Sequence, residues 1–281
     1  MKKSTNGGLV KAYRNEAFLN SANARTIRIL AEYLEPLHRL RRHRIKDTIV
    51  FYGSARVPSQ QQAEENLARL NRQSGNERDP SLDRARRAAQ QDLQASRYYE
   101  DARELAYRLT KWSLALKENQ RFIVCSGGGP GIMEAANRGA SEAGGPTIGM
   151  NISIPYEQSA NPYLTRNLSF EFHYFFMRKF WFVFLAKALV VFPGGFGTMD
   201  ELFELLTLRQ TRKVTKPLSV IVYGEEFWRD IINFDKMVSW GVISPEDLEL
   251  FHLVDSVDSA FNLLRDHFEK AFIGKKRYWH W

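Results

Sequence analysis

The sequence lacks the features typical of secreted and membrane proteins. Its 281 residues include one cysteine, Cys125, which excludes an internal disulfide framework and favours a reducing compartment. The first residues, Met1-Lys2-Lys3, lead into polar residues rather than an apolar core, which argues against a secretory signal. The longest aromatic and aliphatic run, 180–192, is interrupted by Lys187 and is too short to span a bilayer. We therefore expect a cytoplasmic protein.

Several functional classes are also missing. The chain has no internal repeat, no His/Cys cluster with metal-ligand spacing, and no Gly-Lys-Ser/Thr that would complete a Walker loop. Its net charge of +8 would suit nucleic acid, but it suits a small anionic substrate equally well. The densest basic run, 39–44, is interpreted as the solvated end of a helix. We expect no metal, no cofactor, no nucleic-acid partner and no membrane partner.

What the sequence does have is a conspicuous stretch at 188–204, Ala-Leu-Val-Val-Phe-Pro-Gly-Gly-Phe-Gly-Thr-Met-Asp-Glu-Leu-Phe-Glu. Residues 188–192 predict a buried strand, residues 193–197 a glycine-rich turn, and Thr198 the start of a helix. The first N–H groups of a helix are unpaired within it and point at an anion placed there. The stretch therefore predicts a phosphate cradle, made by Pro193, Gly194, Gly195, Phe196, Gly197 and Thr198.

The same residues allow a purely structural interpretation. Thr198 and Glu201 have the spacing of a capping box, in which Thr198 caps the helix and Glu201 reaches back to the cap N–H. A capping box does not explain the three glycines before it, and both interpretations remain open. In the functional interpretation, the helix dipole is expected to keep Glu201 ionised.

Two earlier strands end in turns of the same kind. Residues 48–52 predict a strand that exits through Gly53 and Ser54, and residues 122–125 predict a strand followed by the turn 126–131, which includes Gly128 and Gly129. A third strand, 147–152, leads to Glu157. The second turn departs from a dinucleotide fingerprint, because Ile132 replaces its last glycine and Met150-Asn151 stands where an acidic ribose ligand is expected. This pattern predicts nucleotide binding without NAD.

Strands and helices alternate through the rest of the chain. Further strands are expected at 217–223 and 251–254, with helices at 98–116, 132–143, 226–240 and 256–268. The alternation predicts an α/β fold, a doubly wound, Rossmann-like parallel sheet in which ligands bind at the carboxyl ends of the strands. We expect one domain over 47–270, an N-terminal helical extension at 1–46, a helix-loop-helix insertion at 57–96, and a basic aromatic tail at 271–281.

The segment 170–185 is dense in aromatic residues and also contains Arg178 and Lys179. Charged side chains in such apolar surroundings are costly unless they are paired or face a polar site. The aromatic content exceeds what one helix can bury within a subunit, so we expect a homo-oligomer, a dimer or higher.

The motif Pro193-Gly-Gly-Phe-Gly-Thr-Met-Asp-Glu201 and the upstream pair Arg178-Lys179 resemble the two signatures of the Lonely Guy family. Its members are phosphoribohydrolases, many of which carry the label "lysine decarboxylase-like". The resemblance implies hydrolysis of a purine nucleoside 5'-monophosphate, AMP or an N6-modified AMP, to free base and ribose 5-phosphate. It implies Arg178 and Glu201 as catalytic residues. It places further substrate contacts at Gly53, Ser54, Gly128, Gly129, Glu157 and Lys179, and it also implies pairing of subunits. Phe175 stands where members often have Met.

The sequence allows two other functions to be compared with this one. A nucleotide-binding sensor or carrier would need the cradle but neither Arg178 nor Glu201, so their joint presence argues against it. An amino-acid decarboxylase would need a Schiff-base lysine, and no lysine stands in a suitable context.

Overall fold

The computed structural model describes residues 9–73, 80–154 and 160–275. Over these residues the chain forms one seven-stranded sheet in the order β4-β3-β2-β1-β5-β6-β7, and every neighbouring pair of strands is parallel. The expected doubly wound α/β fold is therefore confirmed. The strands are β1 Thr48–Tyr52, β2 Ile123–Ser126, β3 Thr147–Ile152, β4 Ser169–Phe172, β5 Ala186–Val191, β6 Ser219–Tyr223 and β7 His252–Val254.

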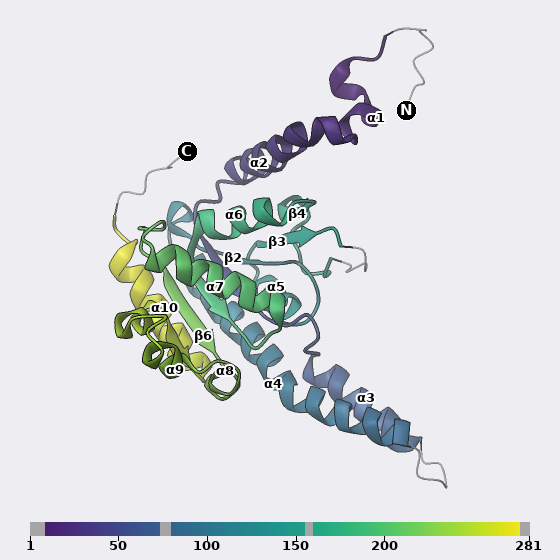
Figure 1. Ribbon diagram of the computed structural model, residues 1–281, viewed down its shortest axis with the longest axis vertical. Helices are drawn as coiled ribbons and strands as arrows, with labels where there is room; N and C mark the ends of the chain where they lie inside the picture. The colour runs from purple at the N-terminus through teal and green to yellow at the C-terminus, as the bar shows by residue number, and fades with distance from the viewer. Residues whose placement is uncertain (1–8, 74–79, 155–159, 276–281) are drawn as a thin grey trace.

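Helices cover both faces of the sheet (Figure 1). They are α1 Glu16–Leu19, α2 Arg25–Arg42, α3 Gln60–Arg72, α4 Pro80–Leu114, α5 Ile132–Glu142, α6 Phe175–Leu185, α7 Phe196–Gln210, α8 Glu225–Ile231, α9 Phe234–Ser239 and α10 Val257–Ala271. In Figure 1, α2 projects from one end of the body, and α3 with the first half of α4 projects from the other. No described helix is both long enough and apolar enough to cross a membrane.

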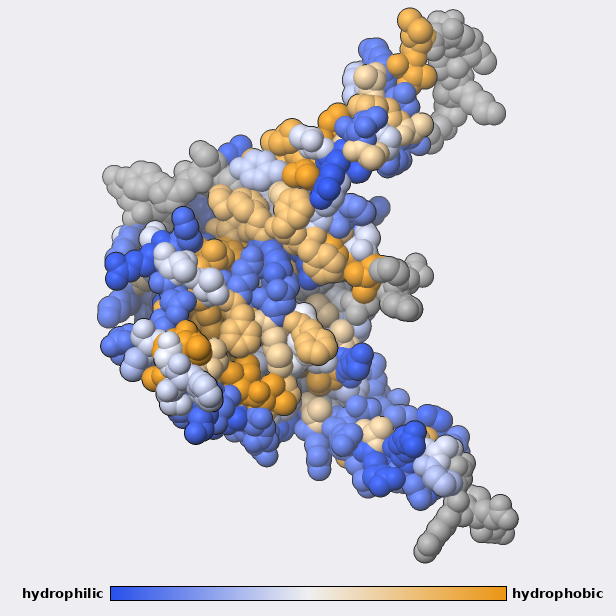
Figure 2. Space-filling view, viewed as in Figure 1, coloured by the Kyte–Doolittle hydropathy of each residue, from blue (hydrophilic) through white to orange (hydrophobic). Residues whose placement is uncertain are grey.

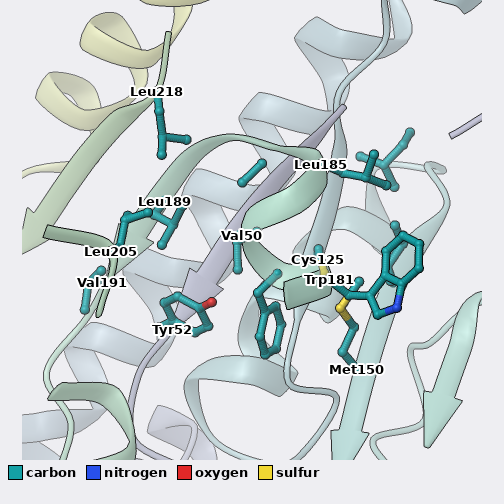
Figure 3. Packing of buried hydrophobic residues seen from close by; sticks show 14 of the residues in the cluster. Val50, Tyr52, Cys125, Met150, Trp181, Leu185, Leu189, Val191, Leu205 and Leu218 are labelled. Atoms are coloured by element: carbon teal, nitrogen blue, oxygen red, sulfur yellow. The ribbon is translucent and has the colours of Figure 1, made fainter. Parts of the chain in front are cut away.

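Strand β1 shows how the two cores arise from one strand. Val50 and Tyr52 belong to the apolar cluster under α6 and α7, whereas Ile49 and Phe51 belong to the cluster under α4, α5 and α10. Successive side chains of a strand point to opposite faces, so a continuous apolar run serves a sheet that is covered on both sides. Figure 3 shows part of the first cluster, with Val50, Leu189 and Trp181 among its members.

The elements differ most from expectation in three places. Strand β4 was not predicted, because its four residues run directly into the aromatic helix α6. The expected helix at 226–240 is divided into α8 and α9, since Ile232 is extended and Asn233 caps α9. The second helix of the expected insertion and the helix at 98–116 form a single helix, α4, of 35 residues. An insertion ending at residue 96 would thus end within this helix.

Candidate active site

A cleft of about 650 Å³ lies at the carboxyl edge of the sheet. The ends of β1 and β3 reach it, together with Gly127 after β2 and residues of α5, α6 and the start of α7. Open α/β sheets bind their ligands at this edge. Of the residues singled out from the sequence, those that line the cleft are Gly53, Ser54, Arg178, Gly195, Phe196, Gly197, Thr198 and Glu201.

The start of α7 decides between the two interpretations of Thr198. The helix begins at Phe196 with Gly195 as its N-cap, and no side chain caps it. Thr198 lies inside the first turn, where its hydroxyl packs on Gly194; a Cβ at residue 194 would come within 2.2 Å of that oxygen. The capping-box interpretation is therefore wrong, because Thr198 is not the cap and Glu201 is not three residues beyond the cap. The turn at Gly195 is instead exposed to the cleft.

Arg178 and Glu201 meet at the cleft from two different helices. Nη2 of Arg178 lies 3.3 Å from Oε1 of Glu201, and their side chains are 15% and 7% exposed. Nε of Arg178 is buried and has no hydrogen-bond partner among the described residues. The guanidinium also lies over the rings of Phe175 and Phe182, at 5.3 and 5.5 Å from their centroids. The pair is thus held in place but keeps hydrogen-bonding capacity for a ligand.

Burial sets the protonation of Glu201. Burial raises the pKa of its carboxyl from 4.5 to about 7, while the charges of Arg178 and Lys179 oppose that rise. Loss of hydration thus acts against the helix dipole, which was expected to favour the ionised form of Glu201. Tyr52 lines the cleft beside this pair, and burial, followed by the nearby Glu201, raises the pKa of its hydroxyl.

Lys179 points away from the cleft. Its Nζ lies 2.8 Å from Oδ1 of Asp200 and 3.2 Å from Oε2 of Glu204, so it ties α6 to α7. Burial alone would lower the pKa of Lys179, but these two carboxylates raise it. In this structure Lys179 fixes the relative position of the helices that carry Arg178 and Glu201.

The second glycine-rich turn approaches the cleft through Gly127 rather than through Gly128 and Gly129. The carbonyl groups of Gly128 and Gly129 accept hydrogen bonds of 3.0 and 3.1 Å from Nδ2 of Asn161, behind the lining. Pro193 is likewise buried, and its carbonyl accepts a 2.9 Å hydrogen bond from the N–H of Ser54. That bond joins the exits of β1 and β5.

Comparison with known proteins bears on the identity of this site. The family model described as "Possible lysine decarboxylase" matches residues 133–264. A cytokinin riboside 5'-monophosphate phosphoribohydrolase of Rhodococcoides fascians is 25% identical over 155 residues, 54% of this chain and 76% of the relative. The probable cytokinin riboside 5'-monophosphate phosphoribohydrolase LOG4 of Oryza sativa subsp. japonica is 26% identical over 153 residues, 54% of this chain and 65% of the relative.

Over about half of its length, the chain is therefore similar to phosphoribohydrolases of the Lonely Guy family. Among solved structures, a molybdenum cofactor binding protein from Rippkaea orientalis matches with a TM-score of 0.45 and 14% identity, covering 79% of this chain and 98% of that chain. So distant a likeness says nothing about the ligand of this protein.

Several cleft residues were not anticipated from the sequence. Tyr52 and Arg56 lie at or just beyond the carboxyl end of β1, and that position was the signal available for them. Phe182 follows Arg178 by four residues and so shares its helix face. Glu157 lies outside the described residues. Among the described residues, no group of three or more His, Cys, Asp or Glu could hold a metal ion.

Proposed function

We propose that this protein hydrolyses the N-glycosidic bond of a purine nucleoside 5'-monophosphate, AMP or an N6-modified AMP, to free base and ribose 5-phosphate. The observation that carries the proposal is the buried Arg178–Glu201 pair, which faces the same cleft as the uncapped start of α7. The names of the curated relatives, phosphoribohydrolases of cytokinin riboside 5'-monophosphates, support the same reaction class.

The start of α7 suits the 5'-phosphate. Gly195 and Gly197 carry no side chain that would hold the phosphate away, and a Cβ at either position would meet nothing within 4 Å. The first N–H groups of a helix and its dipole both favour an anion. In the proposed complex these groups and the Thr198 hydroxyl anchor the phosphate, which places the ribose beside Glu201, about one turn along the helix.

Glu201 then acts at the anomeric carbon. As the bond between this carbon and the base breaks, its electron pair leaves with the base, and the ribose gains oxocarbenium-like positive charge. The Glu201 carboxylate stabilises that charge and accepts a proton from the water that attacks the anomeric carbon. The departing base gains a proton at its ring nitrogen from solvent, and Glu201 releases to solvent the proton that it took from the attacking water. The net reaction therefore consumes one water molecule and gives neutral base and ribose 5-phosphate.

Arg178 has two effects on this chemistry. Its positive charge lowers the pKa of Glu201 and so favours the ionised carboxylate that the reaction needs. Its guanidinium also lines the cleft and carries further N–H groups that can donate to a substrate oxygen. A pKa of about 7 also suits a general base that works near neutral pH.

A non-catalytic nucleotide sensor is the alternative. It would need the cleft and the start of α7, but it would gain nothing from a buried carboxyl with a raised pKa. The deciding experiment incubates the protein with AMP and follows free adenine by chromatography over time. Time-dependent adenine release supports the hydrolase, and retention of intact AMP supports the sensor. A panel of other nucleoside monophosphates then establishes the preferred base.

A further inference from the structure

Asn151 is a buried amide at the cleft that the proposed mechanism does not use. It lies at the carboxyl end of β3, lines the cleft and is 8% exposed. Its Nδ2 donates to the carbonyl oxygen of Phe170 at 3.2 Å and to Oγ of Ser169 at 3.4 Å, both on the neighbouring strand β4. No described residue donates a hydrogen bond to its Oδ1.

These contacts fix the orientation of the amide. A backbone carbonyl only accepts hydrogen bonds, so the atom that faces Phe170 must be the nitrogen. Turning the amide over would put Oδ1 against that carbonyl oxygen and break the bond. Gly128 confines the amide from another side, since a Cβ there would lie 2.5 Å from Oδ1 and 2.8 Å from Nδ2. Asn151 therefore offers the cleft a hydrogen-bond acceptor that cannot easily be exchanged for a donor.

The position of β3 indicates which part of a nucleotide meets this acceptor. The start of α7, where the proposed function puts the phosphate, follows β5, and β3 is the third strand from β5 in the sheet. Strands lie about 4.8 Å apart, so Asn151 is displaced along the cleft by roughly 14 Å. The exocyclic group of a purine is the part of the nucleotide farthest from the 5'-phosphate. Met133, Ile152 and Ile154 line the cleft near this end and suit the apolar faces of a base.

We propose that Oδ1 of Asn151 accepts a hydrogen bond from the exocyclic 6-amino group of the purine, and that the cleft thereby selects 6-aminopurine over 6-oxopurine nucleotides. This inference rests on the proposed function for the placement of the phosphate. A 6-oxopurine such as that of IMP presents an oxygen to Oδ1, and two acceptors facing each other leave both unsatisfied. An N6-monosubstituted adenine keeps one N–H and remains acceptable.

The test measures kcat/KM for base release from AMP, purine riboside 5'-monophosphate and IMP. The wild-type protein is expected to prefer AMP to IMP by about tenfold to a hundredfold. The purine riboside nucleotide, which has neither group, should fall between them. In Asn151→Ala the AMP/IMP ratio should drop to within about threefold, mainly because AMP is turned over more slowly. Asn66→Ala, the same change on exposed α3, should keep the wild-type ratio.

Equal turnover of AMP and IMP by the wild type, or an unchanged ratio in Asn151→Ala, would overturn the inference. If Asn151→Ala fails to fold, the kcat/KM values of the wild-type protein for the three nucleotides still test the inference. If no nucleotide releases its base, the proposed function fails instead. In that case, calorimetry of AMP and IMP binding tests the role of Asn151 independently of catalysis. We expect AMP to bind more tightly than IMP, and equal affinities would contradict the proposed role of Asn151.

Discussion

Replacing Glu201 by glutamine should make the protein more stable and much less active. Glutamine has nearly the shape of the protonated glutamate, and it can still accept a hydrogen bond from Arg178. What it removes is the negative charge that the fold buries at the cleft. Substitutions that stabilise a protein commonly impair its function when they remove a group whose burial is costly but which the active site needs.

The size and pH dependence of the gain follow from the two pKa values. In the unfolded chain Glu201 titrates near 4.5, whereas in the folded chain its pKa is about 7. Below pH 4.5 the carboxyl is protonated in both states and costs nothing. Between pH 4.5 and 7 the unfolded state loses its proton first, so the cost to stability grows with pH, and above pH 7 it is complete. At about 1.4 kcal/mol for each pKa unit, the full cost is about 3 kcal/mol.

Urea unfolding at pH 8 and at pH 4 measures this difference. Glu201→Gln should raise the free energy of unfolding by up to about 3 kcal/mol at pH 8 and leave it unchanged at pH 4. Adenine release from AMP should fall by on the order of a hundredfold. Glu269→Gln, the same change at an exposed position of α10, should show neither effect. Adenine release close to the wild-type rate would refute the catalytic role, and equal stability of Glu201→Gln and the wild type at pH 8 would refute the buried ionised carboxylate.

Three further outcomes are expected. In the wild type, kcat/KM for AMP should rise with pH through about 7 as Glu201 ionises. Lys179→Gln should move that rise to higher pH, because the charge of Lys179 lowers the pKa of Glu201. The same pH profile in the variant and the wild type would contradict this expectation. Adenosine should be a far poorer substrate than AMP in the same adenine assay, since it lacks the phosphate that α7 binds; comparable turnover would remove the phosphate site. Sedimentation at micromolar concentration should show a homo-oligomer, because Phe175 and Phe176 at the start of α6 are half exposed. Figure 2 shows that the surface of the molecule carries apolar residues among polar ones. Phe176→Ser should weaken the association, and a monomeric wild type would contradict the expectation.

The sequence predicted the sheet well where its signals were local. Strands β1 and β3 have the predicted bounds, because a short β-branched or apolar run ends in a turn or a change of polarity. Strand β4 was not predicted. Its buried Phe170 and Phe172 alternate with the exposed Glu171, as expected for a strand, but the aromatic residues that follow obscure this alternation in the sequence. The long helix α4 was divided in two because its first half is polar, yet no Gly or Pro occurs between residues 81 and 114.

The chemistry of the site was less accessible from sequence, because it depends on contacts between distant segments. The pattern Thr198-x-x-Glu201 fits a capping box, but the helix begins two residues earlier, at Phe196. The protonation of Glu201 could not be derived from its helix alone. Its pKa is set by burial and by Arg178, which lies 23 residues away in the chain and on another helix.

This dependence on α6 explains why an arginine is needed beside the carboxylate. Without a positive charge, burial would raise the pKa of Glu201 further, and less of the protein would hold the ionised form at neutral pH. A bound phosphate adds negative charge to the same cleft and pushes the pKa upward again. Lys179 opposes both effects from outside the cleft, while Arg178 opposes them from within it and can also donate to the substrate. In the proposed mechanism, the adjacent pair Arg178-Lys179 thus maintains the charge of Glu201 when the nucleotide anion fills the cleft, which is the state in which the glycosidic bond would break.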